Sequence, residues 1–345
     1  MRVSACVTDR AGMGVFDPHQ SFFSSVRRAA TRLTGGSSVI PSRGNANSLP
    51  TRSSPRTWHR VVVVGLLLGL LAPAPAFPAD ETQDKILEWS LPGLPEPSGV
   101  VYHAKRGSLF VVSDDGTIGE VTVDGKVRAT RALGGDLEGI TYDPGTGYLY
   151  IVREGHEIIF EVDPNGFAIR RRFTIDRSFE GDADFLERGG DGIEGLTFVP
   201  NPDHREGGRF FAVNQFDPPA LVELALPLRS SQERFEKARV VAAHRIASPP
   251  LSDVLWSPEL RAFLIPSALW RSVYVVDEAG SRRASVRVPG IMQEGIALLP
   301  DGAVVIAQDT GGLIKWHPPK PPFEAVAVAN PETVGTSGTH SDEKE

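Results

Sequence analysis

The sequence predicts an all-β fold, a five-bladed β-propeller that follows an N-terminal export segment. Three observations predict it. A phrase made of an acidic residue and a short apolar strand recurs five times, each phrase is followed by further strand-like runs, and helical periodicity is almost absent. The chain has 345 residues, 41% hydrophobic and 23% charged, which is enough to build a large packed domain.

The N-terminal part has the order of an exported protein. Residues 61–72 are apolar, basic residues precede them, and a segment rich in Pro and Ala follows, as in a signal peptide. This run is shorter than the roughly 20 residues that span a bilayer, so we expect cleavage after Ala76 or Ala79. We therefore predict a basic, disordered leader over 1–60, a signal segment over 61–79 and a periplasmic destination. An uncleaved segment that anchors the protein to the inner membrane is the alternative.

Charge changes sign at this boundary. Residues 1–79 carry nine Arg and two Asp, a balance of +7, and the rest of the chain has a balance of −14. An acidic exported part disfavours nucleic acid and anionic membrane surfaces as partners and favours cations. The single cysteine, Cys6, belongs to the leader, so the predicted propeller contains neither a disulfide nor a thiolate.

The repeats organise residues 80–329. Each begins at an acidic residue, and the spacings between these residues are 42, 56, 59 and 41 positions; the acids are Glu96, Glu138, Glu194, Asp253 and Glu294. A second β-forming run follows each first strand, at 108–113, 148–152, 209–213, 262–266 and 303–307. A third lies at 119–123, 158–162, 221–224, 272–276 and 313–316. Repeats of this length with three or four strands are typical of propeller blades.

The remaining segments fit around these repeats. A strand at 86–91 can pair with the last repeat and close the ring, and residues 230–238 offer a turn or two of helix. The insertion at 227–250 leaves room for a degenerate sixth blade, and a β-sandwich is the alternative architecture. The tail at 330–345 has too few apolar residues to fold, so we predict that it is disordered.

The five acids predict a metal site. First strands line the channel of a propeller, so Glu138, Glu194, Asp253 and Glu294, with Glu96, would meet near its axis, where like charges raise one another's pKa. A hard cation such as calcium, held by oxygen ligands, would relieve this repulsion. A second set near the ends of the second strands could complete the coordination: Asp114, Asp115, Glu154, Gln215, Ser267, Gln308 and Asp309. The alternative is that these acids only accept hydrogen bonds between blades.

Three phrases carry a family resemblance: Asp136-Leu-Glu-Gly-Ile-Thr-Tyr142, Gly192-Ile-Glu-Gly-Leu-Thr-Phe198 and Gln293-Glu-Gly-Ile-Ala297. They resemble those of the SdiA-regulated, YjiK-like bacterial proteins, which are distantly related to NHL-repeat propellers. The resemblance covers about residues 92–317 and implies five blades and a calcium site, but no known reaction. One departure stands out, because this chain has Asp253-Val-Leu-Trp256 where that family usually has Asp-Val-Ser-Gly.

The sequence leaves three functions open, and it assigns no catalytic residue and no organic cofactor. The first is a calcium-binding module that holds a small ligand or a periplasmic protein. The second is a calcium-dependent hydrolase of a phosphoester or lactone, which needs an open coordination position and a spare acid. The third is a scaffold for peptide or glycan, for which Trp256, Trp270 and Phe216 are the candidate contacts.

Overall fold

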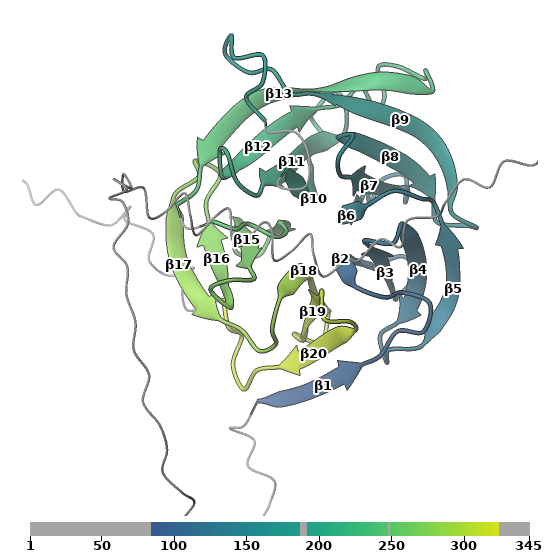
Figure 1. Cartoon of the computed structure of the whole chain (residues 1–345), viewed down its shortest axis with the longest axis vertical. Coiled ribbons are helices and arrows are strands. Elements are labelled where there is room, and N and C mark those ends of the chain that lie inside the picture. Colours follow the sequence, from purple (N-terminus) through teal and green to yellow (C-terminus); the bar gives the residue numbers. More distant parts are fainter. Residues whose placement is uncertain (1–83, 187–191, 248, 324–345) are drawn as a thin grey trace, which may run out of the picture. The chain divides into compact units, whose positions relative to one another are not determined.

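The computed structural model describes residues 84–186, 192–247 and 249–323, and it confirms the predicted all-β propeller (Figure 1). Its strands form three four-stranded sheets and one eight-stranded sheet. The eight-stranded sheet consists of two meanders of four strands, joined where their outermost strands, β9 and β13, pair in parallel. The described residues therefore supply five groups of four strands, arranged around one axis.

Within each group the strands run from the axis outward in an antiparallel meander. The first group is β2 (Pro97–His103), β3 (Ser108–Ser113), β4 (Thr117–Thr122) and β5 (Val127–Ala132). The second is β6 (Leu137–Tyr142), β7 (Leu149–Arg153), β8 (Ile158–Asp163) and β9 (Ala168–Asp176). The third is β10 (Ile193–Pro200), β11 (Gly208–Asn214), β12 (Ala220–Ala225) and β13 (Phe235–Arg245).

The last two groups complete the ring. The fourth is β14 (Leu255–Ser257), β15 (Ala262–Ser267), β16 (Ser272–Val276) and β17 (Arg282–Arg287). The fifth takes β18 (Gln293–Leu298), β19 (Val304–Gln308) and β20 (Leu313–His317) from the end of the chain and β1 (Lys85–Trp89) from its start. Strand β1 pairs antiparallel with β20, so the predicted closing strand joins the two ends of the domain.

Apolar packing between neighbouring groups holds the ring together. The buried apolar side chains fall into five clusters, and each cluster lies between two adjacent groups. Leu109 and Val111 of β3 meet Val305 of β19 in the cluster that joins the first and last groups. Because apolar burial contributes about 25 cal/mol per Å², these five interfaces supply most of the free energy of folding without any disulfide.

Glycines let the inner strands approach one another backbone to backbone. A Cβ on Gly139 of β6 would lie 2.4 Å from the amide nitrogen of Leu196 in β10. A Cβ on Gly195 would lie 2.5 Å from the Cα of Asp253, and one on Gly295 would lie 2.8 Å from the nitrogen of Val100. The glycine that follows the acid in the repeated phrase is therefore a requirement of packing around the axis.

The sequence expectation of a helical turn within the insertion was wrong. Residues 230–238 form no helix: β13 begins at Phe235, and the residues before it lie in turns. The described residues of the insertion at 227–250 supply the long outermost strand of the third group and no separate sheet. Strand β13 lies between β12 and β9 in the eight-stranded sheet, but most of its side chains are exposed or half-buried and several are charged, a pattern that sequence reasoning assigns to loops.

The predictions for the leader 1–60, the signal segment 61–79 and the tail 330–345 concern residues outside the described part of the chain. A search for membrane-spanning helices in the described residues finds none of sufficient length and hydropathy.

Gly139→Ala should destabilise the domain by about 3 kcal/mol, because the added Cβ meets backbone rather than a movable side chain. Gly155→Ala is the matched control, because Gly155 has a φ of +73° but no atom within 4 Å of an added Cβ. Only the left-handed backbone conformation should then destabilise this variant, by about 1 kcal/mol. Urea unfolding of both variants measures the difference. Equal losses would contradict the packing argument.

Candidate metal site on the propeller axis

Four inner strands place a residue at the axis through the same irregularity. The register between the first and second strands shifts near the start of β2, β6, β10 and β18. Such bulges re-aim a side chain out of the regular alternation. The residue at the shift is Glu138 in β6, Glu194 in β10 and Glu294 in β18, and the equivalent residue in β2 is Ser98.

The structure corrects the position of Glu96. It precedes β2, has a φ of +48°, and matches Asp136 of the second group rather than Glu138. The backbone carbonyls of Glu96 and Asp136 each accept a hydrogen bond from the residue just after the second strand: Asp114 N at 3.3 Å and Glu154 N at 2.9 Å. The comparison of the repeats matched Glu96 with Glu138 because Glu96 is the nearest acid before the first strand. In the structure, the residue at the bulge is the one directly before the glycine, which is Ser98 in β2.

The second set also divides in two. Gln215 N and Asp309 N bond the carbonyls of Gly192 and Met292, so Asp114, Glu154, Gln215 and Asp309 occupy equivalent places. Asp115 is exposed and accepts a bond from Thr117 N at 3.0 Å. Ser267 and Gln308 end β15 and β19 and are buried, and Gln308 Oε1 accepts a bond from Ile291 N at 2.9 Å.

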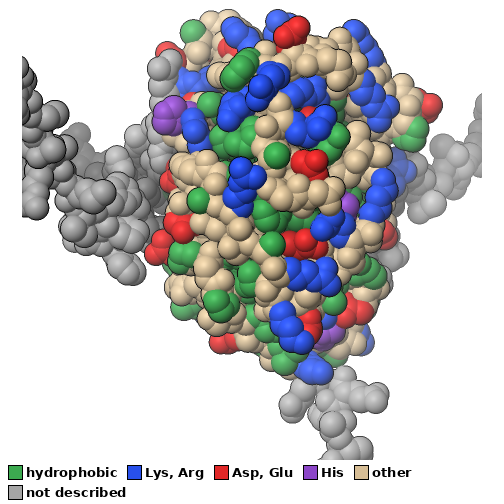
Figure 2. Space-filling model, turned by 90° about the vertical axis from the view of Figure 1, so that its right-hand side faces the viewer, with side chains coloured by type: hydrophobic (Ala, Val, Ile, Leu, Met, Phe, Trp, Pro, Cys, Tyr) green, Lys and Arg blue, Asp and Glu red, His purple; other side chains and the backbone are tan. Residues whose placement is uncertain are grey.

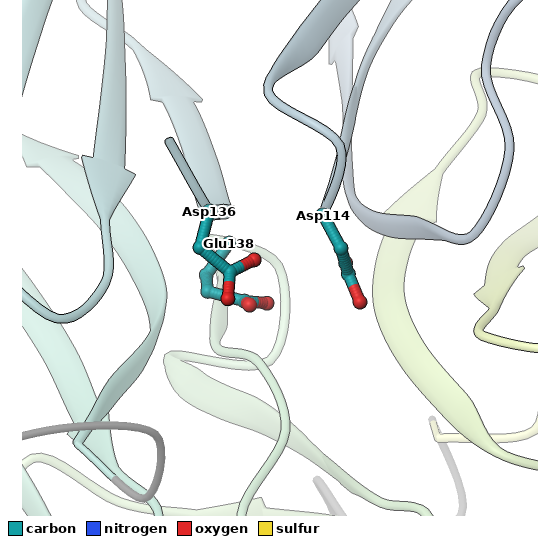
Figure 3. Close-up of side chains that lie close together, drawn as sticks. All are labelled: Asp114, Asp136 and Glu138. Carbon is teal, nitrogen blue, oxygen red and sulfur yellow. The ribbon is translucent and has the colours of Figure 1, made fainter. Parts of the chain in front are cut away.

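Three carboxylates from two neighbouring groups come together at one end of the axis. Asp114, Asp136 and Glu138 each offer an oxygen, and these atoms all lie within 4.8 Å of one another (Figure 3). Glu138 is 9% exposed, Asp114 is half-buried and Asp136 is exposed, so the cluster opens to solvent on one side. Sequence reasoning missed Asp136 as a site residue, although it stands two positions before Glu138 in the repeated phrase.

Burial and mutual repulsion raise the pKa of these carboxyls. Burial, followed by the charges of Asp136, Asp309 and Glu96, raises the pKa of Asp114 to about 8. Although the Asp136 residue is exposed, protein atoms around its carboxyl partly desolvate it and raise its pKa. Burial raises the pKa of Glu138 far more strongly, and the neighbouring carboxylates raise it further. Carboxyls in this state are acids that a cation would help to ionise.

The remaining axial acids continue the same network. Burial raises the pKa of Glu194 well above its usual range, and the charges of Glu154 and Glu294 add to this effect. Burial likewise raises the pKa of Glu294, with contributions from Asp309, Asp114 and Asp253. We call Glu96, Asp114, Asp136, Glu138, Glu154, Glu194, Asp253, Glu294 and Asp309 the axial acids.

Asp253 keeps its place although the glycine after it is missing. It lies before β14, and its Oδ2 accepts a hydrogen bond from Ile296 N of β18 at 3.0 Å. Val254 packs in the apolar cluster between the third and fourth groups, and β14 is only three residues long. The aspartate side chain thus connects the fourth and fifth groups, where other interfaces use direct backbone approach.

Hydrogen bonds between inner strands occur at other interfaces too. Thr141 Oγ1 accepts a bond from Phe198 N at 3.1 Å, and Thr197 Oγ1 accepts one from Trp256 N at 3.0 Å. In contrast to these threonines, Asp253 has a second oxygen, Oδ1, which is buried and lacks a hydrogen-bond partner among the described residues. The backbone N–H groups of Val254 and Leu196 also lie close enough to the Asp253 carboxyl to lower its pKa, so this side chain contacts the third, fourth and fifth groups.

The comparisons with known proteins agree with the fold. Residues 92–217 match a family described as "Phytase-like: Esterase-like activity of phytase". These residues contain all of the first two groups of strands, and with them the cluster of Asp114, Asp136 and Glu138. Together with the arrangement of the sheets, the match places the chain among β-propeller proteins. The curated proteins include no significant match.

Solved structures resemble the chain at low identity. Glutaminyl cyclase of Myxococcus xanthus is 14% identical, with a TM-score of 0.49 over 68% of this chain and 95% of its own. Virginiamycin B lyase from Staphylococcus aureus is 14% identical, with a TM-score of 0.38 over 69% of this chain and 76% of its own. A streptogramin B lyase is 10% identical, with a TM-score of 0.39 over 68% and 97%. Likenesses at this level say nothing of this chain's chemistry.

Without divalent cations, the domain should lose stability as the pH rises from 5.5 to 8.5. A carboxyl whose pKa is higher in the folded protein stabilises it fully below the unfolded pKa and loses that contribution as the pH passes the folded value, about 8 for Asp114. The expected loss is about 2 kcal/mol, or roughly 4–8 °C in Tm. Differential scanning fluorimetry in chelator measures it.

Asp114→Asn should make the dependence of Tm on pH flatter, because asparagine does not titrate and the variant loses the pH-dependent contribution of Asp114. Groups with lowered pKa, such as Glu120 and Asp301, stay ionised across this range and do not obscure the trend. A wild-type Tm that is constant or rises with pH would contradict the raised pKa values.

Proposed function

We propose that the protein is a calcium-dependent hydrolase of anionic esters, phosphoesters foremost, and that it acts at the open end of the axis. One observation carries the proposal: Asp114, Asp136 and Glu138 offer oxygens within 4.8 Å of one another, and the three residues range from buried Glu138 through half-buried Asp114 to exposed Asp136. A cation held there would have protein oxygens on one side and free positions on the other, as a catalytic ion requires.

The donors fit calcium. All three are carboxylate oxygens, and calcium takes six to eight oxygen ligands, whereas zinc and copper prefer nitrogen and sulfur. Asp114 and Glu138 would hold the ion from the buried side, with Asp309 and Glu154 close enough to interact electrostatically with this pair. When bound, calcium would neutralise part of the axial charge and polarise an ester or phosphoryl oxygen.

Asp136 suits the role of general base. It is the most exposed of the three carboxylates, and burial by its surroundings raises its pKa above the usual value for aspartate. A base is most effective when its pKa approaches the working pH, and it must reach the proton that it accepts. Asp136 would take a proton from the water that attacks the ester, while Glu138 beside it keeps its carboxyl oriented.

The family match favours hydrolysis, since its description names an esterase-like activity of phytase and its range includes the three carboxylates. The lactone that sequence analysis considered remains the second ester to test. The proposal also includes the narrower resemblance to SdiA-regulated proteins and export to the periplasm. The protein would be attached to the membrane only if residues 61–79 stay uncleaved. A small ligand or a periplasmic protein would be the partner.

Asp253 favours a second candidate, a calcium-binding module without catalysis. Its buried Oδ1 lacks a hydrogen-bond partner among the described residues, and Asp253 lies near enough to Glu294 to raise the pKa of that carboxyl. A cation enclosed there would connect the fourth and fifth groups and leave no position for substrate. The two candidates differ in place, since the enclosed site is Asp253 with Glu294 and the open site is Asp114, Asp136 and Glu138.

Calcium should raise the Tm of the domain, and Asp114→Asn with Glu138→Gln should abolish most of the rise. At a calcium concentration 100 times the Kd, binding to the folded state alone adds about 2.7 kcal/mol, roughly 5–10 °C. Asp115→Asn is the matched control, because Asp115 is the exposed neighbour of Asp114 and bonds only its own turn. A full calcium shift in the double variant would place the ion elsewhere, and Asp253→Asn then tests the enclosed site.

Hydrolysis should require both calcium and Asp136. With p-nitrophenyl phosphate as substrate, and a lactone in parallel, we expect turnover in calcium and none in chelator. Asp136→Asn should lower kcat about 100-fold or more, because a general base contributes about 10²–10⁴. Most of the calcium-dependent Tm shift should remain, because Asp114 and Glu138 hold the ion from the buried side.

Two outcomes would count against the hydrolase. A calcium shift without turnover on either ester class would favour the non-catalytic module. Unchanged kcat in Asp136→Asn would remove Asp136 from the chemistry.

A further inference from the structure

A cavity lies between the second and third groups of strands, and its lining contains none of the axial acids. It has a volume of about 510 Å³ and lies between β7, β8, β9 and the segment 228–234 that leads into β13. Arginines dominate its lining: it contains Arg170, Arg171, Arg229 and Arg234 against two acids, Asp143 and Glu161. This is the reverse of the axis, where carboxylates gather.

Arg171 forms part of the cavity wall, and its guanidinium group is bonded to other residues of the protein. Arg171 is buried and donates to Glu161 Oε2 through Nε at 3.1 Å and through Nη2 at 2.5 Å. Its guanidinium also donates to the backbone carbonyls of Pro227, Leu228 and Ser231, at 3.1–3.3 Å. These bonds fix the segment before β13 against β8 and β9, so the cavity is built into the fold.

Both acids are occupied within the wall. Glu161 accepts bonds from Arg171, from Tyr150 Oη at 3.0 Å and from Arg170 Nε at 3.4 Å. Asp143 is buried and accepts bonds from Gly145 N at 2.7 Å and from the Thr146 hydroxyl at 3.1 Å. Their charges are therefore committed to the protein, and the lining keeps a net charge of +2.

The other three arginines present guanidinium groups to the cavity, and because Arg170 uses its Nε for Glu161, its two terminal nitrogens are the ones a ligand would reach. Arg170 lies with its guanidinium carbon 4.3 Å from the centre of the Tyr148 ring, and its side chain is 45% exposed. Arg229 and Arg234 are exposed, and no ion pair joins either of them to a carboxylate in the described part of the chain. A Cβ on Gly207 would lie 2.0 Å from Arg229 Nη2, so this glycine makes room for the guanidinium.

The surroundings add to the positive field. The outermost strands β1, β5, β9, β13 and β17 contain twelve Lys and Arg but only three acids, Glu88, Asp176 and Glu236. Figure 2 shows one side of this outer surface, where Lys and Arg predominate over Asp and Glu. A positively charged concave site concentrates anions from solution.

We propose that this cavity binds a small ligand that carries a phosphate or sulfate group. Arginine guanidinium groups match the oxygens of such groups in pairs, and three of them surround a space of about 510 Å³, large enough for a phosphorylated or sulfated small molecule. Tyr148, which Arg170 covers, gives the ligand's organic part an aromatic edge to contact. The site is separate from the axial acids and needs no metal.

Isothermal titration calorimetry of the domain in chelator tests this site apart from the axis. The probes are inorganic phosphate, inorganic sulfate and phenyl phosphate. We expect binding in chelator, and at least a tenfold rise in Kd for Arg229→Gln with Arg234→Gln. Tighter binding of phenyl phosphate than of phosphate identifies an organic ligand, and equal binding identifies the free anion.

Two controls separate local contact from general charge. Arg239→Gln with Arg287→Gln removes the same two charges from exposed positions on β13 and β17 and should leave every Kd unchanged. Asp114→Asn with Glu138→Gln should also leave binding in chelator unchanged, even if it abolishes calcium binding. No binding in chelator, or equal losses in the two arginine pairs, overturns the proposal.

Discussion

Repulsion between carboxylates on the axis is the constraint that shapes the centre of this protein. Glu138, Glu194, Asp253 and Glu294 are brought together from four groups of strands, and burial raises the pKa of each well above its usual range. Such a cluster costs free energy unless it holds protons or binds cations. Since hydrogen bonds between inner strands need no charge, as Thr141 and Thr197 show, a purely structural role does not explain why acids fill these places.

The fold can carry this cost because its stability comes from elsewhere. The five apolar clusters lie between neighbouring groups, away from the axis, and β1 closes the ring by pairing with β20. Apolar burial and ring closure therefore hold the inner strands in place, and the strands in turn force the acids together. A rigid frame that positions groups at an energetic cost is the usual basis of a functional site.

Acidic and basic side chains lie at different distances from the axis in this domain. Among the described residues, carboxylates gather on the axis, whereas the outermost strands have a large excess of Lys and Arg. The axis suits cations, and the cavity beside Arg170 and Arg229 suits anions. With a phosphoester as substrate at the axis, the arginine-lined cavity would be a second site in the same domain that binds a phosphate group.

The sequence by itself determined the all-β propeller, the inner strands and the pairing of the first described strand with the last, because alternating apolar residues and the repeated acid-glycine phrase are local patterns. It also named most of the axial acids. Only the tertiary structure exchanged Glu96 for Ser98 in the inner ring, since a bulge of one residue decides which side chain points inward. Asp136 and the arginine cavity likewise emerged only in three dimensions, because both join residues whose proximity depends on packing between separate groups of strands.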